Sequence, residues 1–234
     1  EGREIPIDEP VYNSATRAIG FAPIEGLRAG TSYQAIIAAA VAGPQGAADF
    51  SWRFSTAVPQ LQSVSPDSGA VGVSLDVLDE AVLTFSVPID DDQLVAANFL
   101  LLREGEAVTL RNGDPQTRDA SVGRYGLAPA DGWQVGSSYT VQISPAVTGP
   151  LGESQSISWQ FQTAVPAILS LNPTAGDTVS VLESTLRAVF DHALDEVALR
   201  AAGSVRLFRE GREIPIDEPV YNSATRAIGF APIE

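Results

Sequence analysis

The feature of this sequence that most constrains its fold is an internal repeat. Residues 1–25 read EGREIPIDEPVYNSATRAIGFAPIE, and residues 210–234 carry the same letters in the same order. An identity over 25 consecutive residues does not arise by chance, so the sequence belongs to a unit of 209 residues that recurs. Such a chain is expected to fold as successive copies of a module rather than as one large domain.

A second, diverged repeat of about half that length lies inside the unit. Residues 21–59 align with residues 127–166 with one residue inserted, so that Gly26, Tyr33, Pro44 and Trp52 match Gly132, Tyr139, Pro150 and Trp159. The unit therefore contains two predicted domains of about 105 residues each. We expect residues 1–57 to be the second half of a domain, residues 58–163 a complete domain, and residues 164–234 the first part of a further one.

This division allows two interpretations of the chain. In one, separate chains complete each other's half domains head to tail, which would leave residues 1–25 and 210–234 competing for the same strand positions. In the other, the sequence is a window of a longer array whose adjoining residues complete both halves. We favour the window. Either way, the expected partners of the chain are neighbouring copies of the same repeat, in the same chain or in adjacent subunits.

Apolar and polar residues alternate through the predicted complete domain, as in half-buried strands. The predicted strands are residues 82–86, 99–103, 107–110, 139–143 and 156–161. Turns are predicted at residues 103–106, where Gly105 can take positive φ, and at 149–152 and its counterpart 43–46. Residues 90–97 and 195–203 read as short helical segments, each capped by its first aspartate. Short strands at such spacings predict an all-β sandwich.

The order of these motifs resembles a known family. Ser63, Pro66 and Gly69 come first, followed by an F-S strand, the acidic helical segment, an N-F strand, G-x-x-Y-x-V and S-W-x-F-x-T. The remaining motif residues are Phe85, Ser86, Asn98, Phe99, Gly136, Tyr139, Val141, Gly149, Gly152, Ser158, Trp159, Phe161 and Thr163. This order resembles the bacterial Ig-like domains of S-layer proteins and large tandem-repeat surface adhesins. The resemblance implies tandem immunoglobulin-like β-sandwiches. The predicted third domain departs from the predicted complete domain at one place, where it has residues 190–193 (FDHA) in place of residues 85–88 (FSVP).

Composition excludes several classes of function. The net charge is −15, and without a basic patch the chain is not expected to bind nucleic acid. No apolar run approaches the roughly 18 residues of a membrane-spanning helix. Cysteine is absent, and all 14 basic residues are arginine, so neither disulfides nor lysine-based amide cross-links can form. Strength must therefore come from packing and hydrogen bonds. These features are compatible with an extracellular or cell-surface location.

Few residues here suggest catalysis. His192 is the single histidine, and next to Asp191 it is expected to be an ordinary surface residue, so we predict no enzyme. Trp52 and Trp159 share strand parity with Phe54 and Phe161 and are expected in the core, as is Trp133.

The acidic run Asp90, Asp91 and Asp92 is the best candidate for an ion, because calcium prefers several carboxylate oxygens on one loop. The run lacks D-x-D-x-D-G spacing, and acidic residues at a helix start are favoured by the helix dipole alone. We therefore expect the fold to need no cofactor, with calcium as the alternative.

The predicted joints between domains are the same four residues, TAVP, at 56–59 and 163–166. They contain no flexible Gly/Ser stretch, and proline restricts the backbone. Each joint should therefore hold its two domains in the same relative orientation. The expected function is thus a semi-rigid rod, as an adhesin stalk or an extracellular fibre. The alternatives are a glycan- or protein-binding module and a non-catalytic appendage of an exported enzyme. The repeat also predicts that residues 208–211 form the hairpin of residues 102–105, and that Tyr33 and Trp52 take the places of Tyr139 and Trp159.

Overall fold

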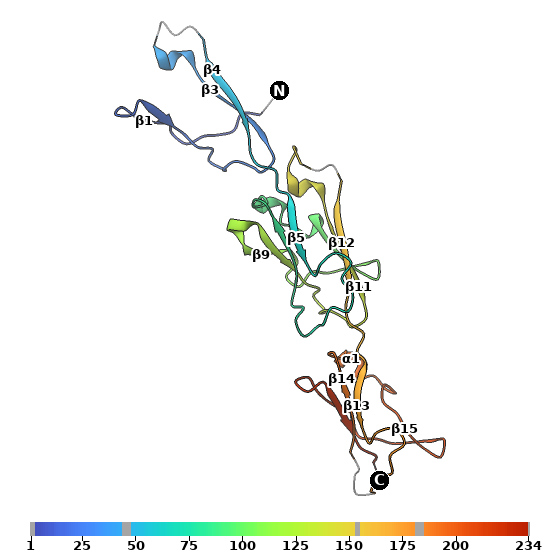
Figure 1. Ribbon diagram of the computed structural model, residues 1–234. Coiled ribbons are helices and arrows are strands. Elements are labelled where there is room, and N and C mark those ends of the chain that lie inside the picture. Colours follow the sequence, from blue (N-terminus) through green and yellow to red (C-terminus); the bar gives the residue numbers. More distant parts are fainter. Residues whose placement is uncertain (1–2, 44–47, 153–154, 181–184, 234) are drawn as a thin grey trace.

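The computed structural model describes residues 3–43, 48–152, 155–180 and 185–233. It is an all-β structure with several short helical turns, and the predicted fold class is confirmed. Three groups of strands follow one another along an elongated molecule, with the N- and C-termini at opposite ends (Figure 1). We call them the first, middle and third domains. Among the described residues, no helix combines the length and apolar character that crossing a bilayer requires.

Two four-stranded antiparallel sheets form the middle domain. The first sheet has the order β5 (Leu61–Ser65), β6 (Ala81–Phe85), β10 (Arg124–Leu127) and β9 (Gln116–Asp119). The second has the order β12 (Ile157–Gln162), β11 (Ser138–Ile143), β7 (Phe99–Arg103) and β8 (Glu106–Val108). The five predicted strands correspond to β6, β7, β8, β11 and β12. The sequence patterns missed β5, β9 and β10.

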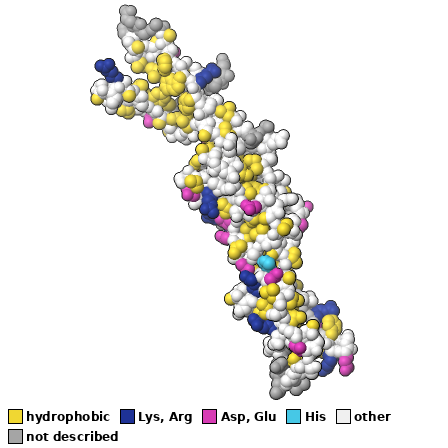
Figure 2. Space-filling view, viewed as in Figure 1, with side chains coloured by type: hydrophobic (Ala, Val, Ile, Leu, Met, Phe, Trp, Pro, Cys, Tyr) yellow, Lys and Arg dark blue, Asp and Glu magenta, His cyan; other side chains and the backbone are white. Residues whose placement is uncertain are grey.

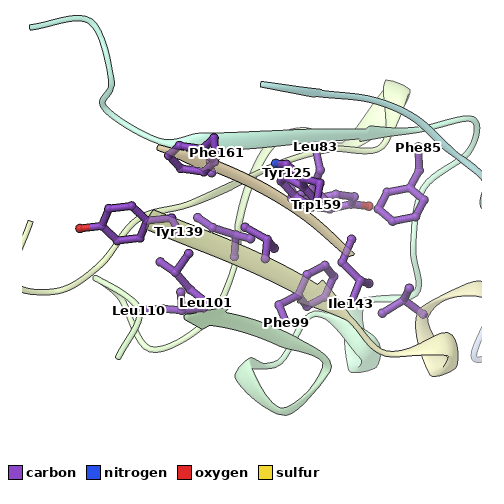
Figure 3. Packing of buried hydrophobic residues seen from close by; sticks show 14 of the residues in the cluster. Leu83, Phe85, Phe99, Leu101, Leu110, Tyr125, Tyr139, Ile143, Trp159 and Phe161 are labelled. Carbon is purple, nitrogen blue, oxygen red and sulfur yellow. The ribbon is translucent and has the colours of Figure 1, made fainter. Parts of the chain in front are cut away.

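The core of the middle domain lies between these sheets (Figure 3). Strand alternation places Leu83 and Phe85 from the first sheet against Val141 and Trp159 from the second, all at most 5% exposed. The hydroxyl of the buried Tyr125 accepts a hydrogen bond from the Ile89 N–H at 2.8 Å, which connects the sheet to the loop after β6. Burial raises the pKa of this tyrosine, so its hydroxyl stays neutral. The predicted core position of Trp159 is confirmed.

The tight turns agree with the sequence where they can be described. Glu104 and Gly105 both have positive φ (50° and 87°) and connect β7 to β8. Glu210 and Gly211 do the same (51° and 79°) between β15 (Leu207–Arg209) and β16 (Arg212–Ile214), so the predicted equivalence of the two hairpins is confirmed. The turn predicted at residues 43–46 extends beyond Gly43 into residues outside the described part of the chain.

Short helical turns occur where the acidic segments predicted them. In the middle domain these are η2 (Asp91–Gln93) and η3 (Ala96–Asn98), and in the third domain α1 (Glu196–Leu199). Asp195 caps α1 as predicted, because its carboxylate accepts from the Val197 and Ala198 N–H groups. The matching prediction for Asp90 is wrong: its side chain makes no cap hydrogen bond and is used elsewhere. Three further 3₁₀ turns are η1 (Ala39–Ala42), η4 (Ala120–Val122) and η5 (Pro145–Thr148).

The first and third domains each contain part of the same sandwich. The first has the pairs β1 (Val11–Asn13) with β2 (Ala18–Gly20) and β3 (Ser32–Ile37) with β4 (Phe50–Ser55). The third has the sheet β13 (Ile168–Asn172), β14 (Leu186–Phe190), β18 (Ala227–Phe230) and β17 (Val220–Asn222), with β15 and β16 beside it. By the repeat, β17–β18 corresponds to β9–β10, and β3–β4 corresponds to β11–β12.

Tyr33 and Trp52 occupy the predicted equivalent positions. Tyr33 lies opposite Phe54 and stacks on it at 5.5 Å, as Tyr139 lies opposite Phe161 at 5.6 Å. The Tyr33 hydroxyl accepts from the Arg28 N–H at 2.7 Å, and the Tyr139 hydroxyl accepts from the Gln134 N–H at 2.8 Å. The two strand pairs therefore share register and side-chain bonding.

The identical segments 1–25 and 210–234 adopt the same local fold in different surroundings. Arg17 and Arg226, which are equivalent, both have positive φ (59° and 51°). In each copy an aspartate closes the hairpin: Asp8 accepts from Ala22 N–H, and Asp217 accepts from Ala231 N–H. Among the described residues, the second copy is packed in a larger sheet, where β18 pairs with β14, whereas β1 and β2 form a two-stranded sheet. The hairpin shape is therefore encoded locally.

Candidate functional site at the first domain joint

The first joint connects β4, which ends at Ser55, to β5, which begins at Leu61. The residues between them are the TAVP segment and one glutamine, and Pro59 is buried. The loop that precedes β3, around Arg28 to Gly30, lies against the loop around Asp90 and the turn that follows η5 in the middle domain. Contacts across this joint are therefore made by backbone as well as by side chains.

The acidic run forms the polar part of the joint. Both carboxylate oxygens of Asp90 accept from the Ala29 N–H, at 2.9 and 3.2 Å. Asp92 lies 2.7 Å from the Arg28 guanidinium, with both side chains about half exposed. A hydrogen bond to a charged acceptor is worth about 1.5–3 kcal/mol, whereas an exposed ion pair contributes about 0.2–1 kcal/mol. Asp90 is thus the main polar anchor of the joint.

Two glycines allow the backbones to meet. The Leu151 N–H donates to the Gly30 carbonyl oxygen at 2.8 Å across the joint. Gly30 (φ 55°) and Gly149 (φ 75°) approach each other across the joint. A Cβ on Gly30 would fall well inside 3.0 Å of the Thr148 carbonyl oxygen, and a Cβ on Gly149 would fall well inside 3.0 Å of the Ala29 carbonyl oxygen. Real Cβ atoms essentially never approach so closely. The joint therefore requires glycine on both sides.

The threonine of TAVP explains how Gly30 is held. The Thr56 hydroxyl donates to the Arg28 carbonyl at 2.6 Å and accepts from the Thr31 N–H at 2.9 Å, and the Gly30 N–H donates to Ala57 O at 2.9 Å. We call this set the threonine clamp.

The same clamp recurs at the second joint. The Thr163 hydroxyl donates to Gln134 O at 2.6 Å and accepts from the Ser137 N–H at 2.9 Å, and the Gly136 N–H donates to Ala164 O at 2.9 Å. The shared four letters did not reveal the clamp, although the G-[TS]-S-Y loop that precedes the threonine in both copies was a visible signal.

Different polar residues cross the second joint. Asp195 is the counterpart of Asp90 in the third domain. Its carboxylate caps its own helix, and so does not bond to the preceding domain as the Asp90 carboxylate does. Instead Arg226 lies 2.9 Å from Asp76 of the middle domain and donates to the Asp191 carbonyl at 2.5 Å. The two joints of the chain are thus chemically distinct.

Asp191 and His192 lie near the second joint, where Figure 2 shows the histidine beside acidic and basic side chains. Asp191 accepts from the Ala167 N–H at 2.7 Å, and His192 Nδ1 lies 3.0 Å from the same carboxylate. The Ala167 hydrogen bond, together with the neighbouring His192, lowers the pKa of Asp191. His192 is half-buried, and the role predicted for it as an ordinary surface residue stays a prediction.

The other sequence candidates do not gather into one site. Among the described residues, no group of three or more His, Cys, Asp or Glu side chains is placed to hold a metal ion. Asp90 and Asp92 have protein partners at the joint, and Asp91 lies in the first turn of η2. The expectation that calcium is not required stays a prediction.

The three tryptophans differ in their surroundings. Trp133 packs edge-on to Tyr139 at 4.7 Å and donates to the Asp79 carbonyl, so its predicted packing is confirmed. Trp52 is 37% exposed, contrary to the expectation of a core residue, because the first domain has no facing sheet among the described residues to cover it.

Comparisons with known proteins place this geometry in a family. Residues 57–163 match the family model described as bacterial Ig-like domain. The middle domain is a bacterial Ig-like domain. No curated protein matches the chain.

Several solved structures are similar to parts of the chain at low identity. The L,D-transpeptidase LdtMt1 in complex with imipenem is 18% identical, with a TM-score of 0.31, over 68% of this chain and 53% of that one. An L,D-transpeptidase from Mycobacterium tuberculosis H37Rv is 21% identical, with a TM-score of 0.30, over 67% and 57%. Domains 1–6 of the surface layer protein SbsC are 16% identical, with a TM-score of 0.33, over 73% and 22%. The chain thus spans about half of the transpeptidase structures and about a fifth of the S-layer one.

Proposed function

We propose that this chain is a structural repeat region of an extracellular bacterial surface protein, in which successive Ig-like domains form a semi-rigid rod. The observation that carries the proposal is the first joint. There, the Gly30–Leu151 backbone hydrogen bond and the Asp90–Ala29 hydrogen bond fasten two domains that are also connected by a short, proline-containing segment.

The contacts of the joint resist bending in a way that a flexible linker does not. A Gly/Ser linker leaves its domains free to reorient, whereas here the threonine clamp holds the Arg28–Thr31 loop against the last residues of its own domain. The same loop then bonds to the middle domain. Because the clamp recurs around Thr163, the exit geometry of successive domains is set by the same hydrogen bonds. These clamps support the proposed domain division at residues 57 and 163.

Alternation of two joints gives the rod a period of two domains, which matches the 209-residue unit of the sequence. The domains line up end to end (Figure 1), so length increases with every repeat. The net charge of −15 keeps neighbouring rods apart in solution. These properties suit a stalk that holds another domain away from a cell, or the shaft of a fibre.

Residual dipolar couplings of the 234-residue chain test this function. We expect the first and middle domains to share one alignment tensor in the native chain. Asp90→Ala should separate the two tensors, because it removes a hydrogen bond worth about 1.5–3 kcal/mol. Asp119→Ala is the matched control, because that aspartate is also on the middle domain but accepts its hydrogen bonds from Ser121 of the same domain. Independent tensors in the native chain would contradict the rod.

A further inference from the structure

We propose that each joint surface is matched in charge to the other type of domain, so that the alternating order of the two types is encoded in the residues at the joints. The first and third domains are of one type, because they share the segments 1–25 and 210–234, and the middle domain is of the other. The partner that each joint surface fits is therefore a domain of the other type. The inference rests on the proposed function, since it names what selects the successive domains of the rod.

The ion pairs of the two joints have opposite polarity. At the first joint the cation belongs to the preceding domain, as Arg28, and the anion to the following domain, as Asp92. At the second joint the anion belongs to the preceding domain, as Asp76, and the cation to the following one, as Arg226. The middle domain thus presents carboxylates at both of its joints, and the other type presents guanidinium groups to it. Two domains of the same type would meet with like charges instead.

The ion pair of the first joint is replaced by uncharged residues at the second. By the repeat, Gln134 is the counterpart of Arg28, and Val197, which is 84% exposed, is the counterpart of Asp92. A domain of the middle type that followed another of its type would therefore bring glutamine to the place where Asp92 receives arginine. The first joint is thus specific for the domain type that precedes it.

The arginine of the second joint is equally specific to its domain type. Gly123 takes the place of Arg226 in the middle domain, since both have positive φ (57° and 51°) and both carbonyl oxygens accept a hydrogen bond at 2.9 Å from equivalent phenylalanines, Phe85 and Phe190. A Cβ on Gly123 would lie 2.7 Å from the Val87 carbonyl oxygen, so the fold of the middle domain excludes an arginine there. The end of a middle-type domain therefore meets this cation on the other type and not on its own.

Further hydrogen bonds hold both partners of the second pair. One terminal nitrogen of Arg226 donates to the Asp191 carbonyl of its own domain at 2.5 Å, and the other lies 2.9 Å from the Asp76 carboxylate. Asp76 also accepts from the Ser74 hydroxyl at 3.0 Å. The two side chains are 38% and 29% exposed, compared with 60% and 48% for the pair at the first joint. Because ion pairs contribute more when they are less exposed and belong to a network, the second joint is the sharper place to test the inference.

Residual dipolar couplings of the full chain test the pairing. We expect the middle and third domains to share one alignment tensor in the native chain. Arg226→Asp should give them independent tensors, because it sets a carboxylate against Asp76, and aspartate tolerates the positive φ of this position. Asp76→Arg alone should do the same without any change in the third domain. The two substitutions together should restore one tensor, since they form the pair again with its polarity reversed.

The repeat supplies a matched control for these variants. Arg17→Asp makes the same change at the same place of the identical segment 1–25, in the first domain. It should leave the tensor of the middle and third domains shared. A loss of the shared tensor in this control would show that the effect of Arg226→Asp does not come from the second joint, and would contradict the inference.

A grafted joint tests the order itself. Arg226→Gly with Val197→Asp gives the start of the third domain the residues of a middle-type start, and should release it from the middle domain. Adding Gln134→Arg supplies the arginine that such a start receives at the first joint, and should restore one tensor. A tensor that stays shared in Arg226→Asp, or a failure of the swapped pair or of the graft to restore it, would overturn the inference while leaving the rod standing. Independent tensors at both joints of the native chain would overturn the rod as well.

Discussion

Replacing Gly30 with alanine should open the first joint without unfolding either domain. The added Cβ would collide with the Thr148 carbonyl oxygen, which belongs to the backbone of the opposite domain and cannot rotate away. The two domains must therefore separate. The separation breaks the hydrogen bond from Leu151 to Gly30 and the one from Ala29 to Asp90.

The expected magnitude follows from these two bonds. A backbone hydrogen bond contributes about 1 kcal/mol and one to a carboxylate about 1.5–3 kcal/mol, so opening the joint costs roughly 2.5–4 kcal/mol. Since about 1.4 kcal/mol is a factor of ten, the amides of Ala29 and Leu151 should exchange roughly 60- to 700-fold faster in the variant. Amide hydrogen exchange followed by NMR measures both sites directly.

The control is Gly136→Ala at the equivalent position of the middle domain. Gly136 has a similar positive φ (62°), so alanine there pays the same left-handed backbone cost of about 1–2 kcal/mol. Its Cβ would meet only the Val165 side chain, at 3.1 Å. The reasoning is refuted if Gly30→Ala leaves the protection of Ala29 unchanged, or if Gly136→Ala reduces it equally.

Two further predictions concern the middle and third domains. Residues 58–163 expressed alone should unfold in one cooperative transition, because they contain both sheets and the core, and a chelator should leave the midpoint unchanged. A chelator-induced fall of about 10 °C, well over 1 kcal/mol, would instead assign calcium to Asp90, Asp91 and Asp92. Asp191 has a lowered pKa in the folded chain, so its contribution is present above the pKa of its unfolded carboxyl and is lost as the pH falls through the lower folded value. Asp191→Asn should therefore reduce the loss of stability on acidification below about pH 4, measured by urea unfolding; an unchanged pH profile would contradict the assignment.

The parts of the fold that were predictable are those whose signal is local. Alternation revealed β6, β7, β11 and β12, because each has one side in the core and one in solvent. The turn at Glu104 and Gly105 was readable for a similar reason, since positive φ at a hairpin favours glycine.

The missed strands lack such a signal. The sequence of β9 is QTRD, with no apolar residue, and the strand lies at the edge of its sheet, where it is half-buried or exposed. β10 is short, and β5 is only partly buried, so neither shows strong alternation. Pairing with β6 places both β5 and β10, and that pairing depends on residues distant in the sequence.

The site shows the same limit at single residues. Asp90 begins a short helical turn and was read as its cap, yet its carboxylate bonds to an amide 61 residues earlier in the chain. Nothing in the local pattern distinguishes it from Asp195, which does cap its helix. Only the neighbouring domain determines the difference. The exposure of Trp52 likewise depends on a sheet that local sequence does not specify.

The local closure of the 1–25 hairpin has a consequence for how a repetitive chain is made. Identical segments 209 residues apart are candidates for exchanging partners during folding. The aspartate bond of this hairpin spans only 14 residues, and hairpins form in about 1–10 μs, while synthesis of 209 residues at about 5–20 per second takes roughly 10 s or more. Each copy therefore closes on itself long before the next one exists. Identity between repeats then carries little risk of misassembly, because no two open copies are present together in a growing chain.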